Sequence, residues 1–276
     1  MSHAGLLLDG CFEAWLTPRP APPLWLFVHV PKTAGSSLAA DLAALIPPYR
    51  SIHIDHLDRA RPAPERYDDA TEAFIAAQRD APCRIASGHV QHRHVQRIQD
   101  ALPGTALFTM LREPVARLVS DYLYQRSPMH PLAAEVRTRI PNFAAFVELK
   151  GQRNRIARHL LPPRVVQEAD VAAGLAMLRA RYAFIGVQER YALGYRALTT
   201  LLAGAPSLPA ARKRVNDGAV AEKAEVVRAL EDQALRDRIA ALNAFDLGIH
   251  KAIAAEWDAI AGPLDAFLGS RSAAAG

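Results

Sequence analysis

Residues 24–46 read LWLFVHVPKTAGSSLAADLAALI, and this stretch decides the fold. Residues 24–30 are almost all apolar, with aromatic and β-branched side chains, which predicts a strand buried on both faces. Pro31 ends the strand because proline has no N–H for a sheet ladder. After the loop 32–37, apolar residues at 38, 42, 45 and 46 follow the 3.6-residue period of a helix. The stretch therefore predicts a strand, a tight loop and a helix.

The loop 32–37 has the features of an anion-binding site. The first N–H groups of a helix have no partner within it, and the helix dipole places partial positive charge there. Gly35 lets the backbone come close to a ligand, and Lys32 adds a full charge. The hydroxyls of Thr33, Ser36 and Ser37 add donors. The loop predicts a phosphate or sulfate site, and the alternative is an ordinary turn with one surface lysine.

The order of residues in this loop excludes the ATP/GTP loop, in which the lysine follows the last glycine. Here Lys32 precedes Gly35. The segment instead resembles the 5′-phosphosulfate loop of sulfotransferases that use 3′-phosphoadenosine 5′-phosphosulfate (PAPS). It is most similar to the branch of the heparan-sulfate 2-O- and 6-O-sulfotransferases and their bacterial relatives, whose loop reads His-x-Pro-Lys-Thr-Ala-Gly-Thr-Ser. The resemblance implies that the donor is bound by Lys32, Thr33, Ala34, Gly35, Ser36, Ser37 and Leu38, with Lys32 also stabilising the leaving phosphate.

A second segment, residues 111–124, reads LREPVARLVSDYLY. It resembles the segment of the same family that binds the 3′-phosphate, Leu-Arg-[Asp/Glu]-Pro-x-x-Arg-x-x-Ser-x-[Tyr/Phe]. The resemblance implies that Arg112 and Ser120 hold the 3′-phosphate, and an arginine can grip a phosphate with a planar fork of donors. Taken alone, Arg112 would fit a structural ion pair. Arg117 lies four residues before Asp121, which predicts a surface ion pair on a helix.

A third element, Ser-Gly-His-Val at 87–90, contains His89. In the 2-O-sulfotransferase branch a histidine in a Gly-His-Val setting is the proposed catalytic base, and the resemblance implies that role for His89. Histidine suits it because it titrates near working pH. The alternatives are a hydrogen-bonded histidine at the rim, or a base at His92 or His94, which we otherwise expect near the acceptor. His29 lies within the apolar strand and is predicted to be a core histidine.

Two further segments resemble the family more weakly. Residues 153–161 (RNRIARHLL) match part of an Asn-x-Gln-Thr-Arg-x-Leu segment near the substrate, which implies acceptor contacts from Asn154 and Arg158 only. Residues 212–216 (RKRVN) stand where the family has a basic loop over the nucleotide. The resemblance implies donor contacts from Arg212 and Lys213, and the alternative is a solvated run of charge.

The pattern along the rest of the chain predicts an α/β fold. Residues 83–90, 105–111 and 182–188 are predicted strands that alternate with helices. Such alternation favours a three-layer α/β/α arrangement with a central parallel sheet, here with a helix-rich C-terminal half, and the resemblance implies the P-loop-like sulfotransferase version. Ligands bind such sheets beyond the carboxyl ends of the strands, so Lys32, His89 and Arg112 are expected together. We expect an irregular lead-in at 1–23 and a single sulfotransferase domain at 24–276.

Composition narrows the class of protein. The chain has 276 residues, half of them apolar, and a net charge of +5 from 33 basic and 28 acidic residues. This modest excess suits an anionic cofactor or substrate and indicates no nucleic-acid partner. Cys11 and Cys83 cannot form a four-ligand zinc site, and the pair His53 and His56 has no third ligand in register, so no metal is expected. No apolar run approaches the roughly 18 residues of a membrane span, and a cytoplasmic location is expected.

Together the resemblances imply a PAPS-dependent O-sulfotransferase. It would transfer a sulfuryl group to a hydroxyl of a carbohydrate or another small hydroxylated metabolite and release 3′,5′-ADP. Two alternatives stay open at this point. One is a nucleotide-dependent kinase, and the other is a non-catalytic module that binds a phosphonucleotide or a sulfated glycan. The sequence leaves the oligomeric state and the identity of the acceptor open.

Overall fold

The computed structural model of the protein has a five-stranded parallel sheet at its centre. The structure describes residues 3–17, 20–55, 57–58, 60–210 and 220–274. The strands lie in the order β2-β3-β1-β4-β5. Their bounds are β1 Trp25–Val28, β2 Tyr49–Ile52, β3 Ile85–Gly88, β4 Ala106–Leu111 and β5 Tyr182–Val187. The first strand therefore lies at the centre, paired in parallel with β3 on one side and β4 on the other.

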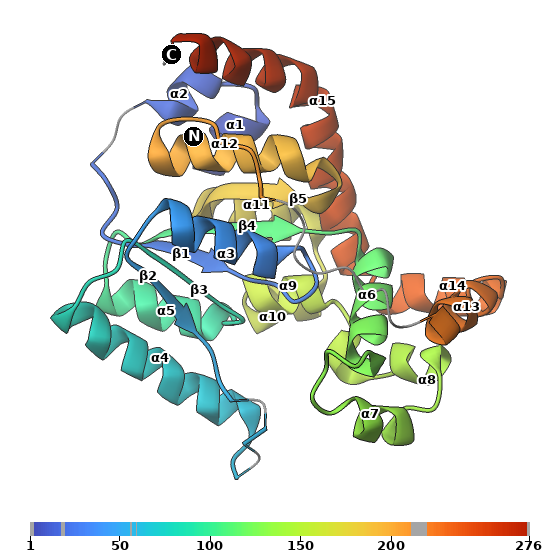
Figure 1. Cartoon of the computed structure of the whole chain (residues 1–276). Coiled ribbons are helices and arrows are strands. Elements are labelled where there is room, and N and C mark those ends of the chain that lie inside the picture. Colours follow the sequence, from blue (N-terminus) through green and yellow to red (C-terminus); the bar gives the residue numbers. More distant parts are fainter. Residues whose placement is uncertain (1–2, 18–19, 56, 59, 211–219, 275–276) are drawn as a thin grey trace.

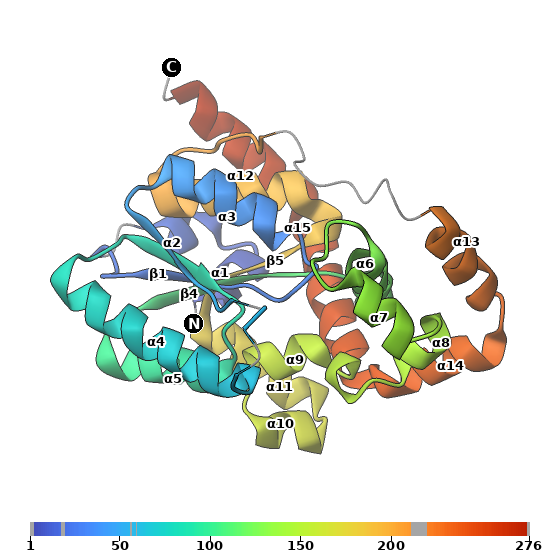
Figure 2. The same ribbon diagram turned by 60° about the horizontal axis from the view of Figure 1, so that its bottom comes forward.

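Helices cover both faces of this sheet, as Figures 1 and 2 show. On one face lie α3 (Gly35–Leu45) and α12 (Tyr191–Ala203). On the other lie α4 (Ala63–Asp80), α5 (His92–Ala101), α9 (Arg155–Leu160), α10 (Pro163–Glu168) and α11 (Val171–Arg181). The predicted α/β fold with a central parallel sheet is confirmed.

Burial explains why residues 25–28, within the predicted range 24–30, form the central strand. Leu26, Phe27 and Val28 are fully buried, as an apolar strand between two helical layers must be. The ring of Phe27 stacks on Phe108 of β4, with centroids 5.1 Å apart. Such packing makes β1 a fixed base for the loop that follows it.

The prediction of an irregular lead-in at residues 1–23 was wrong for residues 3–17. They form α1 (His3–Leu8) and α2 (Phe12–Leu16). Leu7 and Trp15 are fully buried, and α1 packs against β5, α11 and α15 (Ala244–Ala274). The prolines that suggested irregular structure begin only at residue 18, whereas the apolar residues before them have a core to enter.

A second group of helices packs beside the sheet (Figure 1). It comprises α6 (Pro114–Arg126), α7 (Ala133–Arg139), α8 (Phe143–Val147), α13 (Val220–Ala229) and α14 (Gln233–Leu242). Tyr122, Phe143 and Phe146 lie in its own apolar cluster, and the Tyr122 hydroxyl donates to Glu225 at 2.7 Å. Two short 3₁₀ turns, η1 (Lys150–Gln152) and η2 (Gln188–Arg190), complete the elements. The single domain at 24–276 stays a prediction.

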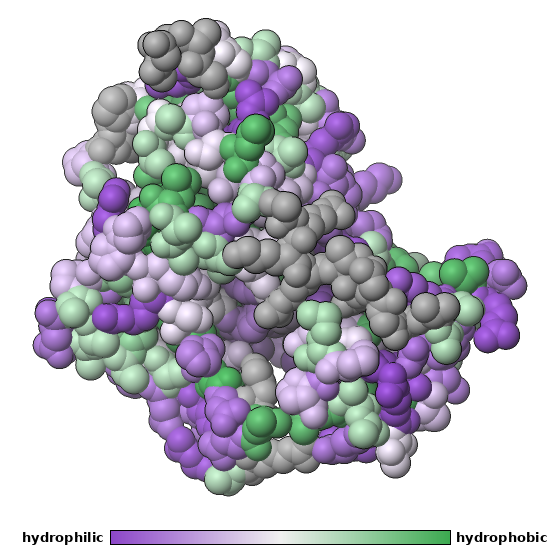
Figure 3. Space-filling model, viewed as in Figure 1, coloured by the Kyte–Doolittle hydropathy of each residue, from purple (hydrophilic) through white to green (hydrophobic). Residues whose placement is uncertain are grey.

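The surface seen in Figure 3 carries hydrophobic side chains in separate groups among hydrophilic ones. Within the described part of the chain, no helix is both long and apolar enough to cross a membrane. Cys11 is exposed and Cys83 is buried, and both are free thiols.

Candidate functional site

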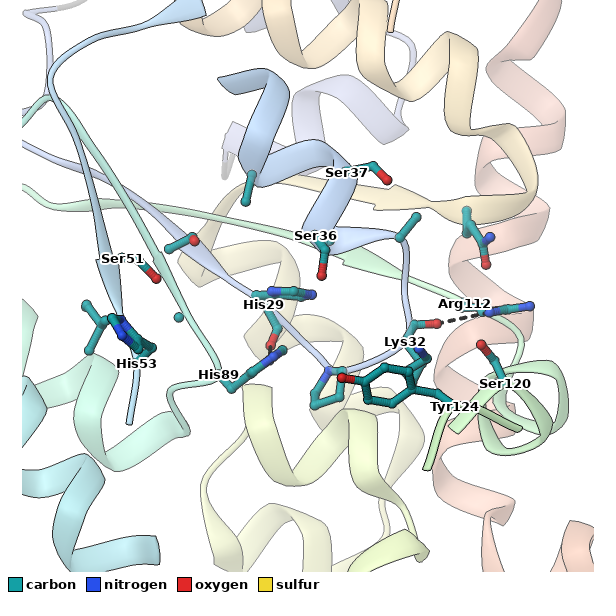
Figure 4. Close-up of a pocket in the computed structure, with 18 of the residues that line it drawn as sticks. His29, Lys32, Ser36, Ser37, Ser51, His53, His89, Arg112, Ser120 and Tyr124 are labelled. Carbon is teal, nitrogen blue, oxygen red and sulfur yellow. Dashed lines mark hydrogen bonds between the residues drawn. The ribbon is translucent and has the colours of Figure 1, made fainter. Parts of the chain in front are cut away.

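A cavity of about 650 Å³ opens where the loops follow the central strands (Figure 4). Side chains from the ends of β1, β3 and β4 and from α6 line it together. The predicted site residues that line it are Lys32, Ala34, Gly35, Ser36, Ser37, His89, Arg112 and Ser120. Segments that lie far apart in the sequence thus meet at one edge of the sheet, as expected for ligand sites of parallel sheets.

The loop between β1 and α3 has a backbone shape suited to an anion. Lys32 and Ala34 both have positive φ angles, 71° and 66°, and Ala34 is the left-handed N-cap of α3. No side chain of the described residues caps this helix. The N–H groups of its first turn, at Gly35, Ser36 and Ser37, therefore remain for a ligand in the cavity that these residues line.

Gly35 is required by its contact with His29. A Cβ built at Gly35 would lie only 2.0 Å from Cδ2 of the His29 ring. The His29 ring is buried and stacks on Phe27 at a centroid distance of 5.2 Å. Burial lowers its pKa well below the ordinary value, and His89, His159 and Lys32 lower it further. His29 is the buried histidine that the sequence predicts, but it also lines the cavity and packs against Gly35 at the start of α3.

Lys32 is held between two other residues of the cavity. Its main-chain oxygen accepts a hydrogen bond from Nη1 of Arg112 at 3.1 Å. Its ammonium nitrogen lies 3.9 Å from the ring centroid of Tyr124, a cation–π contact. Tyr124 lines the cavity and lies on α6 one turn after Ser120. Sequence reasoning missed Tyr124, although its i,i+4 spacing from Ser120 on a predicted helix was a usable signal.

The hydrogen bond of His89 defines which of its nitrogens can act as a base. Nδ1 lies 2.7 Å from the main-chain oxygen of His29. A carbonyl oxygen only accepts hydrogen bonds, so Nδ1 carries the proton and Nε2 carries the lone pair of the neutral ring. Gly88 before it lies against β2, because an added Cβ would come within 2.5 Å of the Ile52 oxygen. His89 thus has a fixed orientation at the cavity wall.

Two residues of the predicted donor loop have side chains inside the protein. The Thr33 side chain is fully buried, and its hydroxyl donates to the Val30 oxygen at 2.9 Å. Leu38 is fully buried in the main core. Neither lines the cavity. Their side chains shape the loop and anchor α3, which leaves direct ligand contacts to their neighbours.

The two other candidate histidines do not line this cavity. His92 is half-buried, and burial together with Arg181 lowers its pKa to about 4. His94 is buried, and its Nδ1 accepts from the Gln91 N–H at 3.0 Å in the capping box of α5. Its Nε2 lies 3.3 Å from Asp68. His94 therefore caps the N-terminus of α5 and anchors it to α4 through Asp68, and it also lines a second cavity.

Of the two predicted acceptor contacts from residues 153–161, Asn154 has a structural role and Arg158 lines the second cavity. Asn154 has a φ of 42°, and its side chain accepts from the Asp246 N–H at 3.1 Å, so it joins α9 to α15. Arg158 donates from Nη1 to the Lys150 oxygen at 2.8 Å and lines the second cavity. Arg212 and Lys213, the predicted basic loop, lie outside the described residues.

Arg117 forms the predicted ion pair with Asp121, but the prediction of a surface pair was wrong. Arg117 is fully buried, with Nη1 at 3.4 Å from Asp121 and Nη2 at 2.8 Å from Gln152. Arg155 of α9 also reaches Asp121, at 3.1 Å. The pair is buried because η1 and α9 cover this side of α6.

Among the described residues, no group of three or more His, Cys, Asp or Glu side chains is placed so that it could hold a metal ion.

No protein-family model matches the sequence, and no curated protein matches it. The fold is similar to the crystal structure of a sulfotransferase from Alicyclobacillus acidocaldarius, with a TM-score of 0.44 and 16% sequence identity. That match covers 86% of this chain and 96% of the other.

Proposed function

We propose that this protein is an enzyme that transfers a sulfuryl group from PAPS to an acceptor hydroxyl. One observation supports the proposal most. The two segments that resemble the donor-binding segments of PAPS-dependent sulfotransferases line the same cavity, and the hydrogen bond between Arg112 and the Lys32 oxygen joins them.

The residues around the cavity fit a donor with anionic groups at both ends. In this proposal the helix N-terminus with Lys32, Ser36 and Ser37 binds the 5′-phosphosulfate. Arg112 and Ser120, from the end of β4 and from α6, bind the 3′-phosphate. A guanidinium matches phosphate geometry through paired N–H donors. A cavity of about 650 Å³ also lies in the range that encloses cofactor-sized ligands.

In the proposed reaction PAPS supplies the sulfuryl group, and the side chains of this protein handle proton and charge. The acceptor oxygen bonds to sulfur while the bond from sulfur to the bridging phosphate oxygen breaks. Nε2 of His89 takes the proton of the acceptor hydroxyl. Lys32 and the N–H groups of α3 stabilise the negative charge that develops on the bridging oxygen. The products are the sulfate ester and 3′,5′-ADP.

A carbohydrate or another small hydroxylated metabolite is the acceptor class, and the residue pattern of the loop favours the heparan-sulfate 2-O/6-O-like branch. Residue types and positions around the cavity support the roles proposed for the donor loop, Arg112, Ser120 and His89.

The test is a transfer assay with labelled PAPS and a panel of hydroxylated acceptors. Lys32→Ala should lower turnover on the order of 100-fold or more, because an electrostatic contact to the developing charge is lost. Lys251→Ala removes an exposed lysine of α15 and serves as the matched control. Near-normal turnover of the Lys32 variant would rule out this role.

A thermal-shift comparison separates the proposal from the two alternatives. A sulfotransferase should be stabilised by 3′,5′-ADP more than by ATP, since only the former fills both anion sites. Preferential stabilisation by ATP would favour a kinase. Binding of 3′,5′-ADP without transfer to any acceptor would favour a non-catalytic module.

A further inference from the structure

The carboxylate of Glu189 joins the ends of two neighbouring strands. Leu111 of β4 and Val187 of β5 are paired in parallel, and the chain leaves the sheet directly after each of them. Beyond this last pair, Oε1 of Glu189 accepts a hydrogen bond from the Glu113 N–H at 2.8 Å. Glu189 belongs to η2, and Glu113 lies between Arg112 and the first residue of α6. The side chain thus continues the connection between the two strands past the end of their ladder.

The hydrogen bonds at the start of α6 leave side chains, not main-chain N–H groups, for a ligand. The carboxylate of Glu113 caps α6 by accepting two N–H groups of the first turn, at 2.9 and 2.6 Å. Pro114 has no N–H, and the N–H of Glu113 itself is bonded to Glu189. The start of α3 differs, since no described side chain caps it. The proposed 3′-phosphate site therefore depends strongly on where the Arg112 guanidinium is held.

Glu189 can influence that guanidinium through the main chain. Neither Glu189 nor Glu113 is among the described residues that line the cavity. The residues directly before them, Gln188 and Arg112, do line it. The peptide that Glu189 holds is the one that joins Arg112 to Glu113, so its position sets the starting point of the Arg112 side chain. From there Nη1 reaches the Lys32 oxygen at 3.1 Å.

His250 of α15 holds the other oxygen of the Glu189 carboxylate. Its Nε2 lies 3.2 Å from Oε2, and a carboxylate oxygen only accepts hydrogen bonds, so the imidazole donates. His250 is buried, and α15 packs against both β5 and α6 (Figure 1). Burial alone would raise the pKa of Glu189, but the hydrogen bonds from His250 and from the Glu113 N–H outweigh it and hold that pKa below its ordinary value. Glu189 is therefore ionised, with each oxygen bonded to a different element.

We infer that Glu189 is a positioning residue for the proposed 3′-phosphate site and that His250 orients its carboxylate. The inference rests on the proposed function. Glu189 fixes the peptide that carries Arg112, and the phosphate itself touches neither Glu189 nor His250. A guanidinium binds phosphate through paired N–H donors, so a small displacement of its starting point weakens both contacts at once.

The test measures the preference for 3′,5′-ADP over 5′-AMP by calorimetry, as the ratio of the two dissociation constants. Glu189→Gln keeps an oxygen for the Glu113 N–H, and its amide can donate to the other tautomer of His250, so the ratio should stay near that of the wild type. Glu189→Asp keeps the charge but is one methylene shorter, so its carboxylate no longer reaches the N–H. Its ratio should fall roughly three- to tenfold, the worth of about one hydrogen bond, with 5′-AMP affinity unchanged.

Arg190→Ala is the matched control. Arg190 follows Glu189 in η2 and also contacts α15, where it pairs with Asp258 at 2.8 Å. It lines neither of the two cavities. Its removal breaks a contact between η2 and α15 but leaves the Glu113 N–H bonded, so the ratio should be that of the wild type. The affinity for 5′-AMP shows in each variant that the donor loop is folded.

His250→Ala tests the orienting role. The ratio should fall less than in Glu189→Asp, because the hydrogen bond to the Glu113 N–H remains. In a Glu189→Asp background the same change should have no further effect, since His250 acts through Glu189. An equal effect of His250→Ala in both backgrounds would overturn this role.

The results also distinguish failure of the inference from failure of the proposed function. A Glu189→Asp protein that keeps the wild-type preference, or a Glu189→Gln protein that loses as much of it, would overturn the positioning role. A wild type with no preference would remove the 3′-phosphate site and the inference with it. A preference that depends on Glu189, in a protein that transfers no sulfuryl group to any acceptor, would keep the positioning role and remove the proposed reaction.

Discussion

Nη1 of Arg112 lies 3.1 Å from the main-chain oxygen of Lys32, although 80 residues separate the two in the sequence. The contact is made because β1 and β4 are paired in parallel, so the segments that follow them leave the sheet at the same edge. One donor of the guanidinium thus fixes the loop, and the cation and the loop N–H groups form one continuous wall of the cavity.

Replacing His89 by Asn should separate the proposed catalytic role of the ring from its structural role. The Asn amide can still donate to the His29 oxygen in place of Nδ1–H, but it provides no base. We expect turnover to fall roughly 10²- to 10⁴-fold, the usual contribution of a general base, with little change in 3′,5′-ADP affinity. His92→Asn, outside the cavity, is the matched control. If steady-state kinetics showed that His92→Asn is the inactive variant, the general base would be His92 and not His89.

The ring of Tyr124 should position the Lys32 ammonium group. Tyr124→Phe keeps the aromatic face and should retain most of the turnover. Tyr124→Leu removes a cation–π contact worth about 0.5–2 kcal/mol, so turnover should fall by roughly two- to thirtyfold. Equal activities of the Phe and Leu variants in the PAPS assay would show that the 3.9 Å contact does not contribute.

The contact between Gly35 and His29 predicts a coupled effect on stability. Gly35→Ala places a Cβ against the His29 ring, and overpacking of this kind costs about 1–3 kcal/mol of unfolding free energy. In a His29→Ala background the ring is gone, so the same Gly35 substitution should cost less. Denaturant unfolding of both single variants and the double variant gives the coupling energy. Additive effects would contradict the contact.

Asp246 should make stability depend on pH between about 4 and 6. Burial raises its pKa to about 6, although it accepts the N–H groups of Ile156 and Ala157. The folded state therefore keeps its proton at a pH where the unfolded state has lost it. The contribution of Asp246 to the unfolding free energy is fully present below pH 3.8, the pKa of the unfolded state, and is lost as the pH rises through about 6, the pKa of the folded state. The loss is on the order of 2–3 kcal/mol.

Asp246→Asn provides the measurement for this pH effect. The amide has no proton to lose in this range, so the difference in unfolding free energy between wild type and variant should change between pH 4 and pH 7. Denaturant titrations at several pH values give that difference. Parallel pH profiles for the two proteins would mean that Asp246 does not titrate as described.

The sequence predicted the parts of the fold that have local signals. The apolar run at 24–30, the polar loop and the helical period after it are contiguous, and the structure has β1, the loop and α3 there. By contrast, β2 was missed because Tyr49–Ile52 is a short strand at the edge of the sheet, with only Ile52 buried. The helices of residues 3–17 were missed because the prolines that follow dominated the pattern.

The candidate site likewise has parts that local sequence signals predicted and parts that they did not. Lys32 and Arg112 follow predicted strands and His89 lies at the end of one, so a parallel sheet was enough to expect them together, and they line one cavity. The second cavity joins Tyr67 of α4 with Arg155 of α9, and no spacing in the sequence relates these helices. Only tertiary packing, with Asp121 holding Arg155, brings these residues together.

Calorimetric binding of 3′,5′-ADP and of 5′-AMP, which lacks the 3′-phosphate, tests most directly whether one nucleotide spans Lys32 and Arg112. We expect the wild type to bind 3′,5′-ADP at least about tenfold more tightly, in line with a charge-assisted phosphate contact. Arg112→Ala should bind both nucleotides with similar affinity, and Lys32→Ala should weaken both. An Arg112→Ala protein that keeps the full preference for 3′,5′-ADP would contradict the account.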